Sequence, residues 1–338
     1  MKKEAFFDVV CMGSATMDVF VETEKQSAIT QSIKGKDTPF ITFKSGEKVI
    51  VKNLHFEVGG GGTNTAACFA KLDLVTGYCG TVGKDANGNA VLHRLVQDGI
   101  AFLGATVSEQ TNYSVILESA LLKDRTILVY KGASEHLLEK DVKLFHARWL
   151  YTSSLAGQSF VSSIAIIKQH RAHGGLIAVN PSNYQIENDS GAVKELLALT
   201  DVAIMNREEA TALVGAGTVM QQFERIRALG PVVVAITDGK NGSFIANGTH
   251  AYHANPTQNI QVRETTGAGD CFASTVIAAL VLDCDLEMAL RWAMCNVEEH
   301  ITHVGAKAGF LTRDELIHRV AKDERSVETL ESTPTTFK

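Results

Sequence analysis

Short apolar runs alternate with longer amphipathic stretches over most of the chain. The runs are rich in Val and Ile, as in buried strands, and the stretches between them have the spacing of helices. The expected strands are Asp8–Gly13, Val75–Gly80, Trp149–Thr152, Leu176–Asn180, Val202–Met205 and Val232–Thr237. The expected helices are Ala86–Gln97, Phe160–Arg171, Ala192–Leu199, Gln221–Leu229 and Phe272–Leu282. This alternation predicts a three-layer α/β/α fold around a doubly wound, mostly parallel sheet.

Two segments lack this alternation and pair short strands instead. In residues 19–57, Phe40–Phe43 and Val49–Val51 flank a turn at Gly46, which is a hairpin pattern. Residues 109–132 hold a second hairpin-like pair, Val115–Leu117 and Thr126–Tyr130. We expect both segments to form a small β-sheet that projects as a lid.

These segments interrupt one large domain, which we expect over residues 1–325. Residues 326–338 are rich in Ser, Thr and Glu and short of apolar residues. Such a composition cannot bury enough apolar surface to stay ordered, so we expect a flexible tail there.

Composition narrows the class of protein. With 45% apolar residues in a length of 338, the chain can bury a substantial core. Its net charge is −6 and Lys and Arg form no block, which argues against a nucleic-acid or membrane partner. No apolar run approaches the ~20 residues of a membrane span. The six cysteines form no C-x-x-C pair, which is typical of reduced thiols in a cytoplasmic protein.

The stretch from Glu264 to Asp270 is the strongest candidate for a functional site. It reads Glu-Thr-Thr-Gly-Ala-Gly-Asp and leads into the predicted helix Phe272–Leu282. Backbone N–H groups at a helix start lack intrahelical partners, and together with the helix dipole they attract an anion such as phosphate. Asp270 can then take the proton of an alcohol that attacks the bound phosphate, which is kinase chemistry. The other interpretation is that Asp270 merely caps the helix.

Two further features lie nearer the amino terminus. Asp18 follows the first predicted strand, where ligands of open α/β sheets gather, so it is a candidate for holding substrate hydroxyls. An aspartate there can also simply cap a turn. Gly59–Gly62 are followed by the small residues Thr63–Ala67, which lead into a helical run, Cys68–Leu72. Such glycines allow a bend and close approach of a ligand, so we favour a hinge that contacts ligand over a flexible linker.

Two stretches at the ends of later strands suit metal and nucleotide binding. Asn206 and Glu209 offer the oxygen ligands that hydrated Mg²⁺ prefers, but they also fit a capped helix start with acids in its first turn. Thr237, Gly239 and Gly242 close the next strand. They form either an ordinary hairpin loop or a stretch of backbone that runs along a nucleotide.

Together these motifs resemble the ribokinase-like family of sugar and nucleoside kinases, also called the PfkB family, over nearly the whole chain. The signatures are the Gly-rich run Gly59–Ala66 and the run from Glu264 to Asp270, which closely matches the family pattern D-T-T-G-A-G-D. The resemblance implies transfer of the γ-phosphoryl group of ATP, with Mg²⁺, to a primary hydroxymethyl group. Asp270 is then the general base, and the anion hole is formed by the amides of Gly267, Ala268, Gly269 and Asp270.

The resemblance also implies binding roles. The acceptor's hydroxyls are held by Asp18, Gly60 and Asn64, and the lid hinge is Gly59–Gly60. Mg²⁺, bound through water, and the phosphates are organised by Asn206 and Glu209. The ATP groove is lined by Thr237, Gly239, Gly242 and Asn296.

Family members often bind K⁺ beside the anion hole. Glu264 and Thr266, with backbone carbonyls of the loop from His300 to Gly309, match that position. Glu264 replaces the more usual aspartate, and its extra methylene leaves activation by a monovalent ion open.

The acceptor is the least defined part of the prediction. We expect a sugar or sugar derivative as the first candidate. A nucleoside is the second candidate, because residues 19–57 have nearly the length found in adenosine-kinase-like members. Phe40, Phe43 and Phe56 are able to stack on a base, although such aromatics more often pack in a core or a dimer contact. The family often dimerises through its lids, so a homodimer is a further hypothesis.

Other function classes fit less well. No G-x-x-x-x-G-K-[ST] sequence occurs, which argues against a P-loop kinase. A dinucleotide-dependent oxidoreductase needs G-x-G-x-x-G after the first strand, where this chain has only Gly13. A catalytically silent sugar-binding homologue usually lacks the base, and Asp270 is present.

Overall fold

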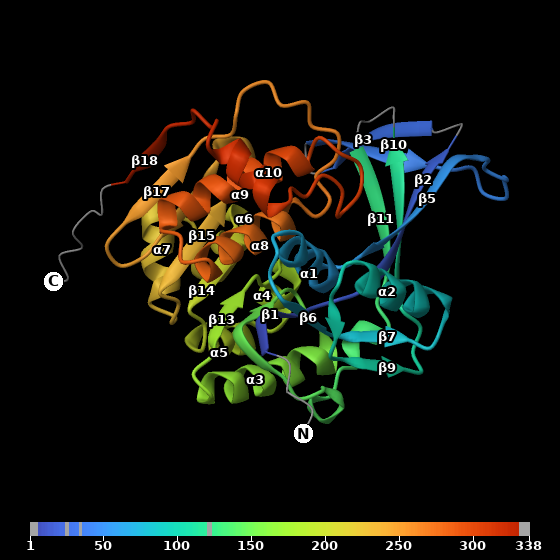
Figure 1. The fold of residues 1–338 in the computed structure, drawn as a ribbon. Coiled ribbons are helices and arrows are strands. Elements are labelled where there is room, and N and C mark those ends of the chain that lie inside the picture. Colours follow the sequence, from blue (N-terminus) through green and yellow to red (C-terminus); the bar gives the residue numbers. More distant parts are fainter. Residues whose placement is uncertain (1–5, 24–26, 34–35, 120–123, 331–338) are drawn as a thin grey trace.

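The computed structural model describes residues 6–23, 27–33, 36–119 and 124–330. Among these residues, ten strands form a central sheet (Figure 1). Its spatial order is β18 (Val327–Thr329), β17 (Ala251–Ala254), β16 (Ser243–Ala246), β15 (Val233–Thr237), β14 (Val202–Asn206), β13 (Leu176–Val179), β12 (His146–Thr152), β1 (Phe6–Met12), β6 (Thr76–Cys79) and β8 (Ala101–Phe102). Strands β15 to β8 pair in parallel, and β16, β17 and β18 continue the sheet in antiparallel pairs. The predicted α/β class is confirmed.

Helices cover both faces of this sheet (Figure 1). One face carries α1 (Gly61–Lys71), α8 (Ala268–Val281), α9 (Leu286–His300) and α10 (Arg313–Val320). The other face carries α3 (Gly157–Ala172), α4 (Asn183–Asn188), α5 (Ser190–Ala198), α6 (Arg207–Val214) and α7 (Val219–Arg227). Side chains of a strand alternate between the two cores, so Val9 and Cys11 pack on the first face and Val10 and Met12 on the second. The described residues also form short 3₁₀ turns at Ala133–Glu135, Glu139–Asp141 and Gly239–Asn241.

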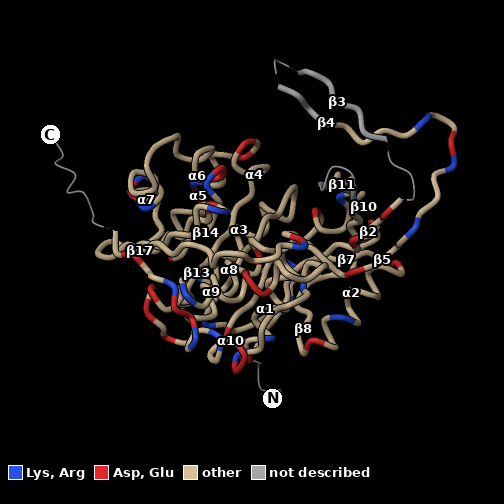
Figure 2. The backbone as a smooth tube through the Cα atoms, turned by 90° about the horizontal axis from the view of Figure 1, so that it is seen from above, with Lys and Arg blue, Asp and Glu red and all other residues tan. Residues whose placement is uncertain are grey.

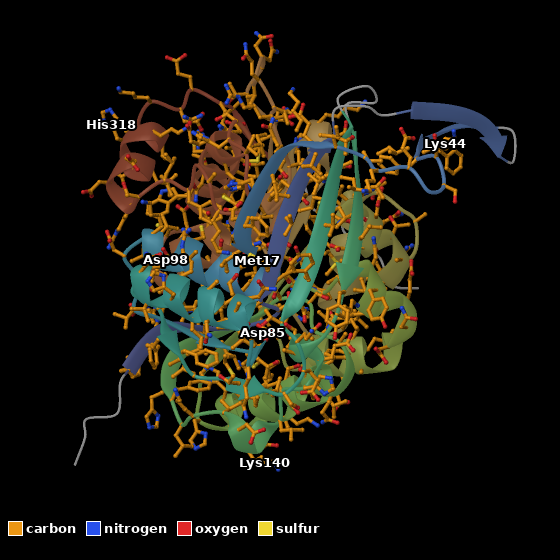
Figure 3. The ribbon with its side chains drawn as sticks, turned by 90° about the vertical axis from the view of Figure 1, so that its right-hand side faces the viewer. Met17, Lys44, Asp85, Asp98, Lys140 and His318 are labelled. Atoms are coloured by element: carbon orange, nitrogen blue, oxygen red, sulfur yellow. The ribbon has the colours of Figure 1, made fainter. Side chains whose placement is uncertain are left out.

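A separate sheet forms the lid. Its spatial order is β11 (Asp124–Tyr130), β10 (Asn112–Ser119), β2 (Thr16–Thr23) and β5 (Val51–Gly59). In Figure 3, Met17 on β2 lies next to α2 (Ala86–Gln97), whose ends carry Asp85 and Asp98. Two small pairs accompany it: β3 (Ser27–Ile33) with β4 (Lys36–Thr42), and β7 (Thr81–Gly83) with β9 (Ala105–Val107). Because Thr16 pairs with Gly59, the lid joins the large domain at the start of α1.

Two local predictions were wrong. The hairpin around Gly46 does not form, because β4 pairs with β3 and β5 pairs with β2. An alternating pattern predicts a strand but does not select its partner. In the predicted tail 326–338, Val327–Thr329 form β18 on the sheet edge, and residues 331–338 lie outside the described part. The lid segments contain residues 24–26, 34–35 and 120–123, which also lie outside it.

Charges are spread along the chain. Figure 2 shows basic and acidic positions interspersed on the backbone. Within the described residues, no helix has the length and apolar character needed to cross a membrane. All six cysteines are free thiols, and five of them are buried.

Candidate active site

Asp270 lies at the junction of two helix starts. Helix α8 begins after Gly267, which has a left-handed φ of 78°, and places Asp270 in its first turn. The Asp270 carboxylate does not cap α8; its Oδ2 accepts a hydrogen bond of 2.9 Å from Asn64 Nδ2 in the first turns of α1. A Cβ added at Gly61 would lie 3.3 Å from Asp270 Oδ1, so the glycine allows this close approach. The helix-cap interpretation of Asp270 is therefore wrong.

The surroundings of Asp270 favour a proton acceptor. Burial raises the pKa of its carboxyl, while the hydrogen bond from Asn64 and the charges of Lys307 and His300 oppose that rise. The residue still keeps part of its surface accessible. A raised pKa brings a carboxylate closer to the operating range of a general base.

The turn before Asp270 presents unused amides. The N–H groups of Gly267, Gly269 and Asp270 have no backbone acceptor within the described chain, whereas Ala268 donates to the Thr265 carbonyl at 3.2 Å. A Cβ at Gly269 would meet nothing within 4 Å, so open space lies in front of this helix start. The turn therefore has the geometry of an anion-binding site, with Ala268 partly committed to the turn itself.

Asp18 faces the same junction from the lid. It lies on β2, 8% exposed, between Ser114 on β10 and Glu57 on β5. Burial raises its pKa to about 6; Ser114 and Lys307 oppose the rise, and Glu57 adds to it. A Cβ at Gly59 would stand 1.8 Å from Asp18 Oδ2, so only glycine fits beside this carboxylate.

Lys307, which was not predicted from the sequence, lies beneath this junction. The side chain is 7% exposed, and its Nζ donates to the Val58 carbonyl and, at 3.0 Å, to Thr63 Oγ1. Burial lowers its pKa to about 8, against the raising effects of Glu57 and Asp18. The local sequence, Ala306-Lys307-Ala308, gave no signal for this burial, because lysine is mostly exposed in proteins.

The nucleotide-side candidates lie at the carboxyl ends of neighbouring strands. Asn206 ends β14 and pairs with Thr237, which ends β15. Gly239 has open space around it, and Gly242 has a φ of 86° with the Ala254 carbonyl 2.2 Å from an added Cβ. The three positions Asn206, Thr237 and Gly239 thus share one edge of the sheet.

Asn206 and Glu209 also form a helix cap. Asn206 Oδ1 accepts from the Glu209 N–H at 2.8 Å, and Glu209 Oε2 accepts from the Asn206 N–H at 2.8 Å. Burial raises the pKa of Glu209, and hydrogen bonds from the backbone of Asn206 and Asn183 oppose it. The capping interpretation holds, and it fixes the carboxylate at the sheet edge without excluding a contact to water.

Asn296 does not reach that edge. It is fully buried in α9, donates to Thr275 Oγ1 at 2.8 Å and accepts from the Leu311 N–H at 2.9 Å. Both ends of the amide are thus used inside the protein. Its position suits a structural link between α8 and α9 better than contact with ATP.

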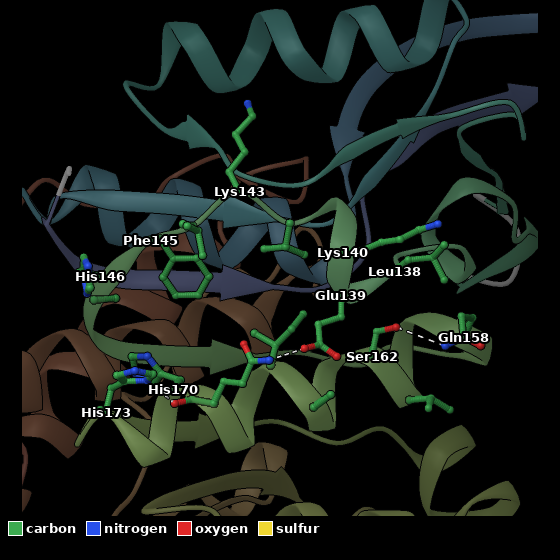
Figure 4. A pocket seen from close by; sticks show the side chains of 18 of the residues that line it. Leu138, Glu139, Lys140, Lys143, Phe145, His146, Gln158, Ser162, His170 and His173 are labelled. Carbon is green, nitrogen blue, oxygen red and sulfur yellow. Dashed lines mark hydrogen bonds between the residues drawn. The ribbon is translucent and has the colours of Figure 1, made fainter. Parts of the chain in front are cut away.

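A large groove of about 1100 Å³ lies elsewhere, between α3 and the segment before β12 (Figure 4). Its lining includes Leu138, Lys143, His146 at the amino end of β12, and His170. Because Asp270 and Asn206 lie at the opposite, carboxyl edge of the sheet, this groove contains no candidate residue.

Residues 7–308 match a family model described as pfkB family carbohydrate kinase. The chain belongs to the PfkB family. It is therefore a kinase of the class that acts on sugars or nucleosides.

Known relatives align with this PfkB kinase over most of its length. A ribokinase of Haemophilus influenzae is 27% identical over 289 residues, covering 82% of this chain and 92% of that protein. The structure of Arabidopsis thaliana ribokinase with ribose and ATP aligns at a TM-score of 0.75 and 22% identity, covering 94% of this chain and 99% of that one. An Escherichia coli structure with ATP and Mg²⁺ aligns at a TM-score of 0.78 and 18% identity, covering 94% and 100%. The ribokinase-like fold with a lid sheet is confirmed.

Glu209, at the carboxyl edge of the sheet, is an acidic residue suited to Mg²⁺. Within the described chain, no cluster of three His, Cys, Asp or Glu side chains could hold a metal alone. Mg²⁺ usually keeps several waters and binds one or two carboxylates together with substrate phosphates. The carboxylate of Glu209, held at the sheet edge, fits such binding through water.

Some oxygens of the candidate potassium ligands already have hydrogen-bond partners in the protein, and others have none among the described residues. Glu264 Oε2 accepts from the Gly305 N–H at 2.8 Å, while Glu264 Oε1 and Thr266 Oγ1 are buried without partners among the described residues. The Thr266 carbonyl faces His300 Nε2 at 2.8 Å. The site is therefore partly occupied by the protein's own groups.

Proposed function

We propose that this PfkB kinase transfers the γ-phosphoryl group of ATP to a primary hydroxymethyl group of a sugar or sugar derivative. The observation that carries the proposal is the Asp270 carboxylate, hydrogen-bonded to Asn64 at 2.9 Å and placed beside the unused amides of the α8 turn. A base and an anion site in contact are the two groups that phosphoryl transfer to an alcohol requires.

In this mechanism residues of the lid and of the start of α1 orient the acceptor. The Asp18 carboxylate accepts hydrogen bonds from the hydroxyls of the acceptor, and the Asn64 amide accepts or donates them. The backbone at Gly59 and Gly60 lets the acceptor approach closely. Asp270 then takes the proton of the attacking hydroxyl as its oxygen forms the new bond to the γ-phosphorus, while the bond from that phosphorus to the ADP oxygen breaks and ADP leaves. The amides of Gly267, Gly269 and Asp270 neutralise charge that develops on the phosphoryl oxygens.

The nucleotide is proposed to lie along Asn206, Thr237, Gly239 and Gly242. Glu209 would hold Mg²⁺ through water, and when bound the ion supplies charge neutralisation on the phosphates. Closure of the lid would exclude water, so that ATP is not hydrolysed.

A nucleoside acceptor is the second candidate. Phe43 on the segment after β4 and Phe56 on β5 are 44% and 55% exposed, so aromatic faces are available near the lid. Such rings favour stacking on a base. The same exposed rings, together with Leu54 and Leu128, also support lid-to-lid dimerisation; light scattering that shows a monomer would contradict the dimer.

The direct test is release of ADP from ATP and Mg²⁺ against a panel of ketoses, aldoses, sugar acids and nucleosides. We expect acceptor-dependent release with one class of sugar. Release with nucleosides alone would replace the first candidate by the second. ATP binding without release for any acceptor would favour the catalytically silent homologue.

Asp18 gives the acceptor site a testable pH dependence. Its pKa is raised to about 6, so the carboxylate becomes neutral as the pH falls through that value and can no longer accept two hydroxyls. We expect kcat/KM for the acceptor to fall below pH ~6. Asp18→Asn should lower kcat/KM at pH 8 by about 10- to 100-fold, the range for a hydrogen bond to a charged group.

In Asp18→Asn, kcat/KM for the acceptor should also fall less steeply at low pH, because Asp270 is then the remaining carboxylate that titrates at the site. The raised pKa of Asp18 means that its charge destabilises the folded state above pH ~6. Asp18→Asn should therefore be at least as stable as the wild type at pH 8. An unchanged kcat/KM at pH 8 would remove Asp18 from the acceptor site.

A further inference from the structure

His300 holds two carbonyl groups at once. It ends helix α9 and is 1% exposed. Its Nδ1 lies 2.6 Å from the Ala308 carbonyl oxygen, and its Nε2 lies 2.8 Å from the Thr266 carbonyl oxygen. Carbonyl oxygens only accept hydrogen bonds, so each ring nitrogen must donate. Both contacts are hydrogen bonds only in a doubly protonated, positively charged imidazole.

This ring connects the anion-binding turn to the loop that packs on it. Thr266 directly precedes Gly267, and the Ala306 carbonyl packs so closely on Gly267 that an added Cβ would lie 2.5 Å from it. The His300 charge acts on Asp270, where it favours the ionised carboxylate. The ring of Phe310 packs against the imidazole, with the two ring centroids 5.0 Å apart.

The same location is where the family resemblance implies K⁺. The residues of this chain fit such an ion poorly, because the Thr266 and Ala308 carbonyls face N–H groups of His300 instead. Glu264 Oε2 is taken by the Gly305 amide. The buried side-chain oxygens that remain without partners at this position, among the described residues, are Glu264 Oε1 and Thr266 Oγ1.

We propose that the imidazolium of His300 takes the place of a monovalent cation in this kinase and acts as a positioning residue for the anion-binding turn. The ring supplies the positive charge and also fixes the carbonyl that precedes Gly267. The inference rests on the proposed role of this turn in phosphoryl transfer. It implies that the wild-type enzyme works without K⁺.

The first test compares kcat in KCl and in NaCl at equal ionic strength. We expect the wild type to differ by less than about twofold between the salts. His300→Ala should lose about 10²-fold in kcat in NaCl, the scale of a misplaced catalytic group, with little change in the acceptor's KM. K⁺ should restore part of the loss, because the two freed carbonyls can then bind the ion. Activation of the wild type by K⁺, or loss without rescue, would overturn the proposal.

His303→Ala is the matched control. This histidine lies three positions further on, its side chain is 46% exposed, and it contacts the carbonyl of Glu299. We expect wild-type kcat and the same indifference to K⁺. An equal loss in both variants would indicate a general effect of the segment and would contradict a specific role of His300.

Two measurements do not depend on activity and so separate this inference from the proposed function. Nitrogen-15 NMR of the wild type should show protons on both ring nitrogens of His300 at neutral pH; a single-tautomer pattern would overturn the inference. Thermal unfolding should show a higher Tm in KCl than in NaCl for His300→Gln and no such difference for the wild type. If these results hold while no acceptor is phosphorylated, the proposed function fails and the assignment of the ring remains.

Discussion

Asp270→Asn is expected to lower kcat by about 10²–10⁴, the contribution of a general base, while the protein folds normally. The amide has the shape of the carboxylate but cannot take the proton of the acceptor hydroxyl. Its oxygen can still accept the hydrogen bond from Asn64, which is 2.9 Å long in the wild type. Steady-state kcat with the best acceptor of the panel measures the effect.

The fold of this variant should be at least as stable as that of the wild type. Burial raises the pKa of Asp270, so the charged carboxylate is disfavoured in the folded state and a neutral amide relieves that cost above the unfolded pKa. Calorimetry should show unchanged ATP binding. A variant that keeps near-wild-type turnover would exclude Asp270 as the base.

Asn64→Ala is a useful companion. It removes the hydrogen bond to Asp270 and leaves the carboxylate in place. Because that hydrogen bond lowers the pKa of Asp270, its loss should move the acid limb of kcat to higher pH. An acid limb that stays in place would show that the hydrogen bond does not tune the base.

Local signals in the sequence predicted the features that depend on neighbouring residues. The helix Ala86–Gln97 was predicted with its observed bounds from its helical spacing; in the structure Asp85 caps it and accepts from the Gly88 N–H. The same holds for the turn at Gly267, where a glycine with φ 78° is needed to start α8. The sheet class followed from alternating strands and helices alone.

Contacts between distant segments were not predictable in the same way. Lys307 reaches Thr63, 244 positions away, and His300 reaches Thr266, 34 positions away. Nothing in the residues around His300 indicates that two carbonyls will converge on its ring. The pairing of β5 with β2 instead of β4 has the same cause, since strand partners are chosen by the fold and not by the local pattern.

Gly267→Ala is expected to lower both kcat and stability. A side chain at φ 78° is strained, and its Cβ would lie 2.5 Å from the Ala306 carbonyl oxygen, so the turn must shift. Displaced amides no longer face the phosphoryl oxygens, and losing one such donor costs about 10²–10³ in kcat. Strained backbone of this kind lowers the free energy of unfolding by about 1–3 kcal/mol. Denaturant unfolding and steady-state kinetics measure the two effects.

Two other glycines separate these effects. Gly46 has the same φ of 78° with nothing within 4 Å of an added Cβ, so Gly46→Ala should lose stability and keep kcat. Gly269 is helical and also open, so Gly269→Ala should gain up to about 1 kcal/mol of stability. Its methyl group would nevertheless enter the space in front of the α8 amides, so kcat should fall. A wild-type kcat in Gly269→Ala would mean that the phosphoryl group is not transferred in the space in front of the α8 amides. This conclusion would hold even if Gly267→Ala lowered kcat.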